Sequence, residues 1–231
     1  MKTGSSILSL ALILAATTSA FAGTVVLKFE GIVPSGQNDV AIGNFYDGGG
    51  GAANNFGITF SSNALALCLV TPTNGCGNNA SRGGFGDPTS QAGGLLFLTG
   101  TSTFLDDSAG FTNGFSLFYS SLVGPGSLTV FSGLDGAGSV LGTLALPLTT
   151  LQGCEPQESA QFCPFAPVGL SFAGVGESIE FSGAANAIVF DDVTFGNATP
   201  DPVPEPSSLA LLVTGFGAVA TQLRRRYLRN A

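Results

Sequence analysis

The chain has 231 residues, of which only 10% are charged, and its formal net charge is −8. It contains no His, which excludes serine–histidine and cysteine–histidine catalysis and any His-ligated zinc site. The excess of acidic residues argues against nucleic-acid binding, because that function needs a basic surface opposite the phosphates.

The first 22 residues have the parts of a secretory signal peptide. Lys2 supplies the positive charge, and residues 7–16 form an apolar stretch that is too short to span a bilayer. Residues 20–22 read Ala-Phe-Ala, which is an A-x-A cleavage site. The sequence therefore predicts a signal helix over residues 1–22, export across the inner membrane and a mature chain that begins at Gly23.

Between residues 23 and 196, short apolar runs are separated by Gly, Asn and Pro. This pattern predicts an all-β domain, and the spacing of the runs favours a two-sheet antiparallel β-sandwich of the jelly-roll type. Alternation places Phe115, Leu117 and Tyr119 on one face of their strand. Strands are predicted at residues 25–32, 57–61, 64–70, 95–99, 115–120, 127–131, 140–146, 168–172, 178–181 and 188–195.

An even number of cysteines in an exported chain indicates disulfides. Cys68 and Cys76 flank one turn-rich stretch, and Cys154 and Cys163 flank another. Four cysteines allow three connectivities, of which we expect the local one, with each cysteine bonded to the other across its own stretch. A zinc site is disfavoured because the close Cys-x-x-Cys spacing is absent.

Two adjacent carboxylates, Asp191 and Asp192, fall inside the last predicted strand, where unneutralised charge is costly. Because neighbouring strand residues point to opposite faces, one of the two should face the apolar side. Glu30 in the first predicted strand would join them if the first and last strands are neighbours. A structural calcium ion would offset the cost, and the alternative is an aspartate that accepts backbone hydrogen bonds at a strand edge.

Few other residues are candidates for chemistry. Tyr46 lies in a loop-like stretch, NFYDGGG, from which it would be able to stack on a ligand, whereas Tyr119 is expected in the core. Asp106 and Asp107 precede Ser-Ala-Gly and are expected in a turn, as is the hairpin sequence at 135–138. A glycosidase needs two carboxylates paired across a cleft, and the sequence identifies no such pair, so we expect no enzymatic activity.

The other end of the chain carries a second targeting element. Residues 197–202 form a Pro-rich polar linker, and the uncharged residues 207–223 are at the short limit for a membrane helix. A basic tail, 224–231, follows directly, and positive charge resists translocation. We therefore expect a single transmembrane helix with the body outside the cell membrane. The residues that would stop transfer are Arg224, Arg225 and Arg226.

Residues 203–206 read Val203-Pro204-Glu205-Pro206 and stand immediately before this apolar segment. The order of tripeptide, short helix and Arg cluster resembles the PEP-CTERM sorting signal of bacterial surface proteins, over the region 203–231. The resemblance implies an exosortase-type membrane protease as partner, which recognises the tripeptide and removes the tail. It also implies a bacterium that makes exopolysaccharide. A plain membrane anchor without processing is the alternative.

The body between the two ends is strongly acidic. It holds fourteen of the fifteen acidic residues and only two cations, Lys28 and Arg82, which gives a net charge of −12. Such a body has no electrostatic attraction to anionic lipid or nucleic acid. Its strand pattern, Phe29-Glu30 and the closing DDVTF resemble carbohydrate-binding-module sandwiches, and this resemblance implies a calcium site built from acids of the first and last strands.

The sequence thus predicts a non-enzymatic protein that is transiently anchored and then held at the cell surface or in the extracellular matrix, in association with exopolysaccharide. One alternative is a calcium-dependent carbohydrate-binding module that uses Glu30, Asp191 and Asp192 for the metal and Tyr46 for the ligand. A second alternative is a polysaccharide-active hydrolase that uses an acidic pair.

Overall fold

The fold is that of a computed structural model, which describes residues 24–34, 37–69, 92–121, 123–149, 162 and 164–200. The predicted signal peptide and sorting signal lie outside the described residues. So do three of the four cysteines, Cys76, Cys154 and Cys163, while Cys68 is buried at the end of a strand. Within the described ranges, no helix combines the length and the hydropathy that crossing a bilayer requires.

The described residues form twelve strands and two single-turn 3-10 helices, and every strand pairing is antiparallel. The strands are β1 (Val26–Leu27), β2 (Asp39–Ala41), β3 (Ile58–Phe60), β4 (Ala64–Cys68), β5 (Gly93–Phe97), β6 (Ser102–Phe111), β7 (Phe115–Ser121), β8 (Gly126–Phe131), β9 (Val140–Leu146), β10 (Ala166–Leu170), β11 (Gly176–Ser182) and β12 (Ile188–Phe195); the helices are η1 (Ala52–Asn54) and η3 (Leu134–Gly136).

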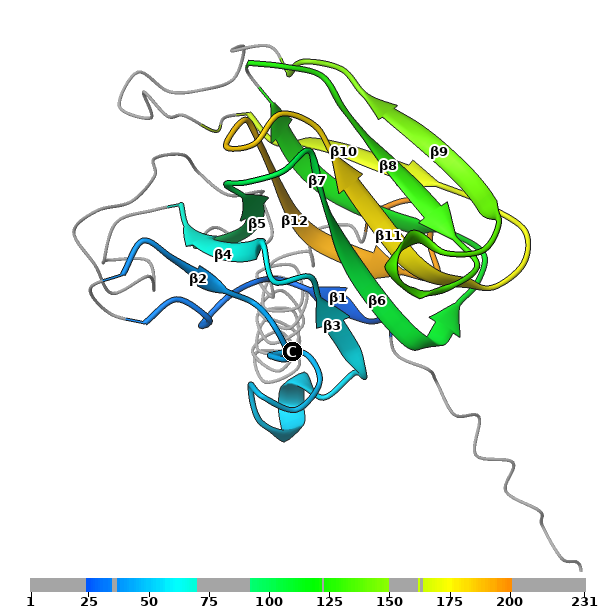
Figure 1. The fold of residues 1–231 in the computed structure, drawn as a ribbon, viewed down its shortest axis with the longest axis horizontal. Helices are drawn as coiled ribbons and strands as arrows, with labels where there is room; N and C mark the ends of the chain where they lie inside the picture. Colours follow the sequence, from blue (N-terminus) through cyan, green and yellow to red (C-terminus); the bar gives the residue numbers. More distant parts are fainter. Residues whose placement is uncertain are drawn as a thin grey trace, which may run out of the picture.

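The strands build two sheets that pack face to face (Figure 1). The larger sheet has the order β10-β7-β12-β5-β4-β2, with β1 paired to β12, and the smaller sheet has the order β3-β6-β11-β8-β9. The predicted two-sheet antiparallel sandwich is therefore confirmed. The first and last strands are neighbours, which was the condition for Glu30 to approach the two aspartates, since Val26 pairs with Thr194 and Leu27 with Val193.

The main core lies between the sheets and is rich in phenylalanine. Phe181 of β11 meets Phe190 of β12 across the two layers, with ring centroids 4.9 Å apart. The predicted face of β7 is confirmed, because Phe115, Leu117 and Tyr119 all belong to this core. Such alternation buries one face of each sheet and leaves the other for solvent or for a second layer.

The sequence predictions for two segments were wrong. The longest strand, β6, was not predicted, and Asp106 and Asp107 lie in its middle and not in a turn. The first predicted strand, 25–32, is extended only at Val26–Leu27, because Phe29 adopts φ 56°, which ends the extended conformation. The predicted hairpin at 135–138 is confirmed, since η3 and its flanking residues connect the antiparallel pair β8 and β9.

Candidate functional site

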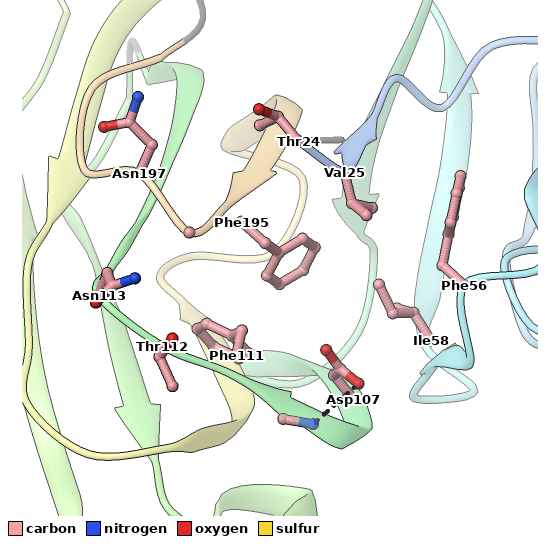
Figure 2. A pocket seen from close by; sticks show the side chains of 12 residues that line it. Thr24, Val25, Phe56, Ile58, Asp107, Phe111, Thr112, Asn113, Phe195 and Asn197 are labelled. Atoms are coloured by element: carbon pink, nitrogen blue, oxygen red, sulfur yellow. Dashed lines mark hydrogen bonds between the residues drawn. The ribbon is translucent and has the colours of Figure 1, made fainter. Parts of the chain in front are cut away.

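A cavity of about 430 Å³ opens at one end of the sandwich, between the two sheets. Residues at the start of β1 and the end of β12 line it from the larger sheet, and β3 and β6 line it from the smaller sheet (Figure 2). Its volume is within the range of small-molecule sites, roughly 300–1,000 Å³. The lining residues are Thr24, Val25, Phe56, Ile58, Asp107, Gly110, Phe111, Thr112, Asn113, Phe195, Gly196 and Asn197.

Aromatic side chains form the apolar surface of this cavity. The rings of Phe111 and Phe195 meet edge to face, with centroids 5.0 Å apart and an interplanar angle of 69°. Phe56 stands half-buried on the opposite side, next to Val25 (Figure 2). The Phe56 ring is stacked on the ring of Tyr46 behind it, and the two ring centroids are 6.2 Å apart. The cavity therefore offers fixed rings to the apolar face of a ligand.

A bulge in β6 places a carboxylate in the cavity wall. Asp106 pairs with Ser178 of β11, but the next pair joins Phe111 to Gly176, so β6 contains extra residues between these two points. The Oδ1 atom of Asp107 accepts hydrogen bonds from the backbone N–H groups of Ala109, at 3.0 Å, and Gly110, at 3.2 Å. Bulges redirect side chains in this way and often occur next to functional sites.

Asp107 is the only charged residue among the twelve that line the cavity, and its side chain is 8% exposed. One of its oxygens bonds within the bulge, and the other points toward the ring of Phe195 (Figure 2). The carboxylate is thus fixed in orientation and partly removed from water.

The rest of the rim is polar, and it includes residues from both ends of the described body. Thr24 stands on one side, and Asn113 and Asn197 stand on the other (Figure 2). The chain leaves β12 along this rim and is tied to the body, because the N–H of Gly196 donates to the carbonyl of Gly114 at 2.9 Å. Asn197 Oδ1 accepts the N–H of Thr199 at 3.1 Å. The linker therefore starts from a fixed position at the cavity.

No protein-family model matches this chain, and no curated protein matches it. Some solved structures resemble it weakly. A carbohydrate-binding module of Cellvibrio mixtus lichenase 5A, in complex with cellotriose, is 16% identical over 48% of this chain and 82% of its own, with a TM-score of 0.34. The C-terminal module of the LamC laminarinase from Zobellia galactanivorans is 12% identical over 50% and 89%, with a TM-score of 0.31.

The K2 cleaved adhesin domain of Lys-gingipain is 10% identical over 76% of this chain and 98% of its own, with a TM-score of 0.38. At such TM-scores, none of these similarities carries an argument about ligand or activity.

The prediction that Tyr46 presents its ring from an exposed loop was wrong. Its side chain is 3% exposed, and its hydroxyl accepts the backbone N–H of Phe29 at 2.7 Å. The loop folds its aromatic residues inward, so that Tyr46 packs edge to face on Phe29 and Phe45. Tyr46 therefore supports the cavity from behind, through Phe56, and does not line it.

Asp191 and Asp192 are both buried, at 0% and 4% exposed, as is every residue of β12. A second bulge lies here, since Asp192 has φ 48° and the register with β7 shifts between Asp191 and Thr194. Asp191 Oδ1 accepts the N–H of Asp192 at 2.8 Å. The backbone hydrogen bond that was the alternative to calcium is therefore present.

Glu30, which the sequence suggests as a calcium ligand together with Asp191 and Asp192, bonds to the backbone. Glu30 Oε1 accepts the N–H groups of Ala92, at 2.9 Å, and Gly93, at 3.3 Å. Over the described part of the chain, which includes Glu30, Asp191 and Asp192, no group of three or more acidic or cysteine side chains is arranged to hold a metal ion.

The three carboxylates lie around the Tyr46 phenol instead. Burial raises the pKa of Tyr46, and the charges of Asp191, Glu30 and Asp192 add to that increase, while the hydrogen bond from the Phe29 N–H opposes it. These groups form a buried polar cluster of the core, apart from the cavity.

Sequence reasoning missed the cavity residues Phe56, Asp107, Phe111 and Phe195. They come from segments far apart in the chain, and no local pattern joins them. The one usable signal was the DDSAG sequence that begins at Asp106, where Gly110 permits the φ of +75° that the bulge requires.

Proposed function

We propose that this sandwich is a non-catalytic domain that binds a carbohydrate in the cavity between β1, β3, β6 and β12. The observation that supports it is the pairing of fixed phenylalanine rings with a rim of hydroxyl, amide and carboxylate groups. Sugars combine an apolar C–H face with hydroxyl groups at their edges, and both find partners in such a cavity.

A hydrolase has less support. Glycosidases use two carboxylates roughly 5–10 Å apart, and Asp107 is the only acidic residue among the twelve described residues that line the cavity. The chain also lacks His as a general base. The cavity is therefore suited to binding a ligand and not to cleaving it.

Binding by the mature protein is tested with an oligosaccharide array, followed by calorimetry on any sugar retained. Phe56→Ala removes one cavity wall and should weaken binding by about five- to tenfold. Phe131→Ala is the matched control, since Phe131 is also half-buried but does not line the cavity. Absence of retained sugars, or equal loss in the two variants, would contradict the proposal.

We propose further that the protein is exported and sorted through its ends, with Pro204-Glu205-Pro206 recognised by an exosortase-type protease and the body passed to exopolysaccharide. Asn197 at the cavity rim and Ser207 at the start of the apolar segment are ten residues apart, so at most about 36 Å of chain joins them. While the tail is attached, the cavity would stay near the membrane.

Sorting is tested by the intact mass of the protein recovered from the cell surface or medium. A species that begins at Gly23 and ends near Val203 is the expected result. A C-terminus that retains Arg224 to Arg226 would leave only a plain anchor.

A further inference from the structure

We propose that the cavity selects sugar residues that carry a free amino group, in preference to neutral or acidic sugars, and that Asp107 determines this preference. The inference rests on the proposed function, since it specifies the class of carbohydrate that the same cavity takes.

The geometry of Asp107 is that of a preset acceptor. Two N–H groups of its own bulge, from Ala109 and Gly110, hold Oδ1, so the carboxylate needs no reorganisation when a ligand arrives. The other oxygen points toward the ring of Phe195 (Figure 2). A protonated amine beside that oxygen makes a charge-assisted hydrogen bond, which is stronger than the bond that a neutral hydroxyl makes.

The ring next to this carboxylate favours the same group. Phe195 is held against Phe111 at 5.0 Å and faces the cavity. The face of an aromatic ring attracts a cation within about 6 Å. An ammonium group that bonds to Asp107 and lies over the face of Phe195 therefore interacts favourably with both.

The charge of the surroundings disfavours acidic sugars. None of the twelve described residues that line the cavity is Lys or Arg, so a uronate carboxylate there would meet Asp107 without an opposite charge from them. Because Asp107 is 8% exposed, its interaction with a ligand charge is screened less than that of a surface carboxylate. The net charge of −12 on the body acts at longer range in the same direction.

The test compares three trisaccharides by calorimetry on the mature protein, at mildly acidic pH and low salt. They are a β-linked glucosamine trimer, its fully N-acetylated counterpart and a galacturonate trimer. The glucosamine trimer should bind about tenfold more tightly than the N-acetylated trimer, and the galacturonate trimer should bind least. Asp107→Asn keeps an Oδ1 acceptor for the bulge and should remove the tenfold preference, so that the glucosamine and N-acetylated trimers bind with similar affinity.

Asp106→Asn is the matched control. It makes the same change of charge one residue away, on a side chain that is not part of the cavity and whose Oδ1 accepts the N–H of Asp135. An equal loss of preference in both variants would show that a polycation is merely attracted to an acidic body, and would overturn the inference. Equal binding of amino and N-acetylated trimers would overturn the inference alone. If no trimer binds while the array retains another sugar, the inference fails and the proposed function stands; if the array retains none, both fail.

Discussion

The backbone N–H of Phe29 donates a hydrogen bond of 2.7 Å to the hydroxyl of Tyr46, inside the core. Phe29 has φ 56°, a left-handed conformation that is strained for a bulky residue. The bond satisfies the buried N–H of Phe29, and the two rings pack edge to face at 5.8 Å. Because Phe56 also stacks on Tyr46, the same phenol supports a wall of the cavity.

Replacing Tyr46 with Phe would leave the N–H of Phe29 buried without its acceptor. We expect the free energy of unfolding to fall by about 1–3 kcal/mol, measured by urea titration of the mature protein. Tyr119→Phe is the control, because its hydroxyl donates to the carbonyl of Pro147, an exposed residue whose carbonyl water can reach. Equal losses in the two variants would mean that the Phe29 bond adds no special stability.

The same phenol predicts how stability depends on alkaline pH. Burial raises the pKa of Tyr46 in the folded protein, so the folded state holds this proton more tightly than the unfolded chain, where tyrosine titrates near pH 10. The raised pKa of Tyr46 therefore adds to the free energy of unfolding. This added stability is complete below about pH 10 and is lost above it, by up to about 1.4 kcal/mol per pH unit. Urea titrations at increasing alkaline pH give the free energy of unfolding at each pH. This free energy should fall less steeply with pH for Tyr46→Phe than for the natural protein, and an equally steep fall in both would count against the prediction.

The regular part of this fold could be predicted from sequence. β9 and β12 have the bounds that their apolar pattern indicated, and the face of β7 was assigned correctly, because alternation follows directly from the pleat. The two bulges, at Asp107 and Asp192, could not be predicted in this way. A bulge changes the direction of a side chain without changing the composition of the strand.

The candidate site was less predictable than the fold for a related reason. Tyr46 stands in a Gly-rich stretch that is typical of exposed loops, yet packing against Phe29 and Phe60 buries it. The cavity depends on where the end of β12 meets the bulge of β6, and this is a property of the assembled sandwich.

The disulfide pairing remains a prediction, and peptide mapping without reduction tests it. We expect one peptide that joins Cys68 to Cys76 and another that joins Cys154 to Cys163. Each closes a short loop and should contribute about 2–3 kcal/mol through the entropy of the unfolded chain. Urea titration with and without a reducing agent measures that difference, and a peptide linking Cys68 to Cys154 or Cys163 would contradict the local pairing.

The position of residues 196–200, which follow β12 at the cavity rim, depends on a glycine of β10. A Cβ atom at Gly169 would overlap the carbonyl oxygen of Ala198, so Gly169→Ala must displace the chain just after Asn197. We expect a loss of about 1–3 kcal/mol in the free energy of unfolding and faster protease cleavage within residues 196–200. Sugar binding should weaken as well, because Asn197 forms part of the cavity rim.

Gly124→Ala is the control for this displacement, because a Cβ at Gly124 would meet only the Cβ of Ala184, at an ordinary 3.9 Å. It should leave stability, cleavage and binding unchanged. If Gly169→Ala behaves like Gly124→Ala in all three measurements, residues 196–200 can be displaced without a loss in the free energy of unfolding. The cavity rim would then not depend on the packing of Ala198 against β10.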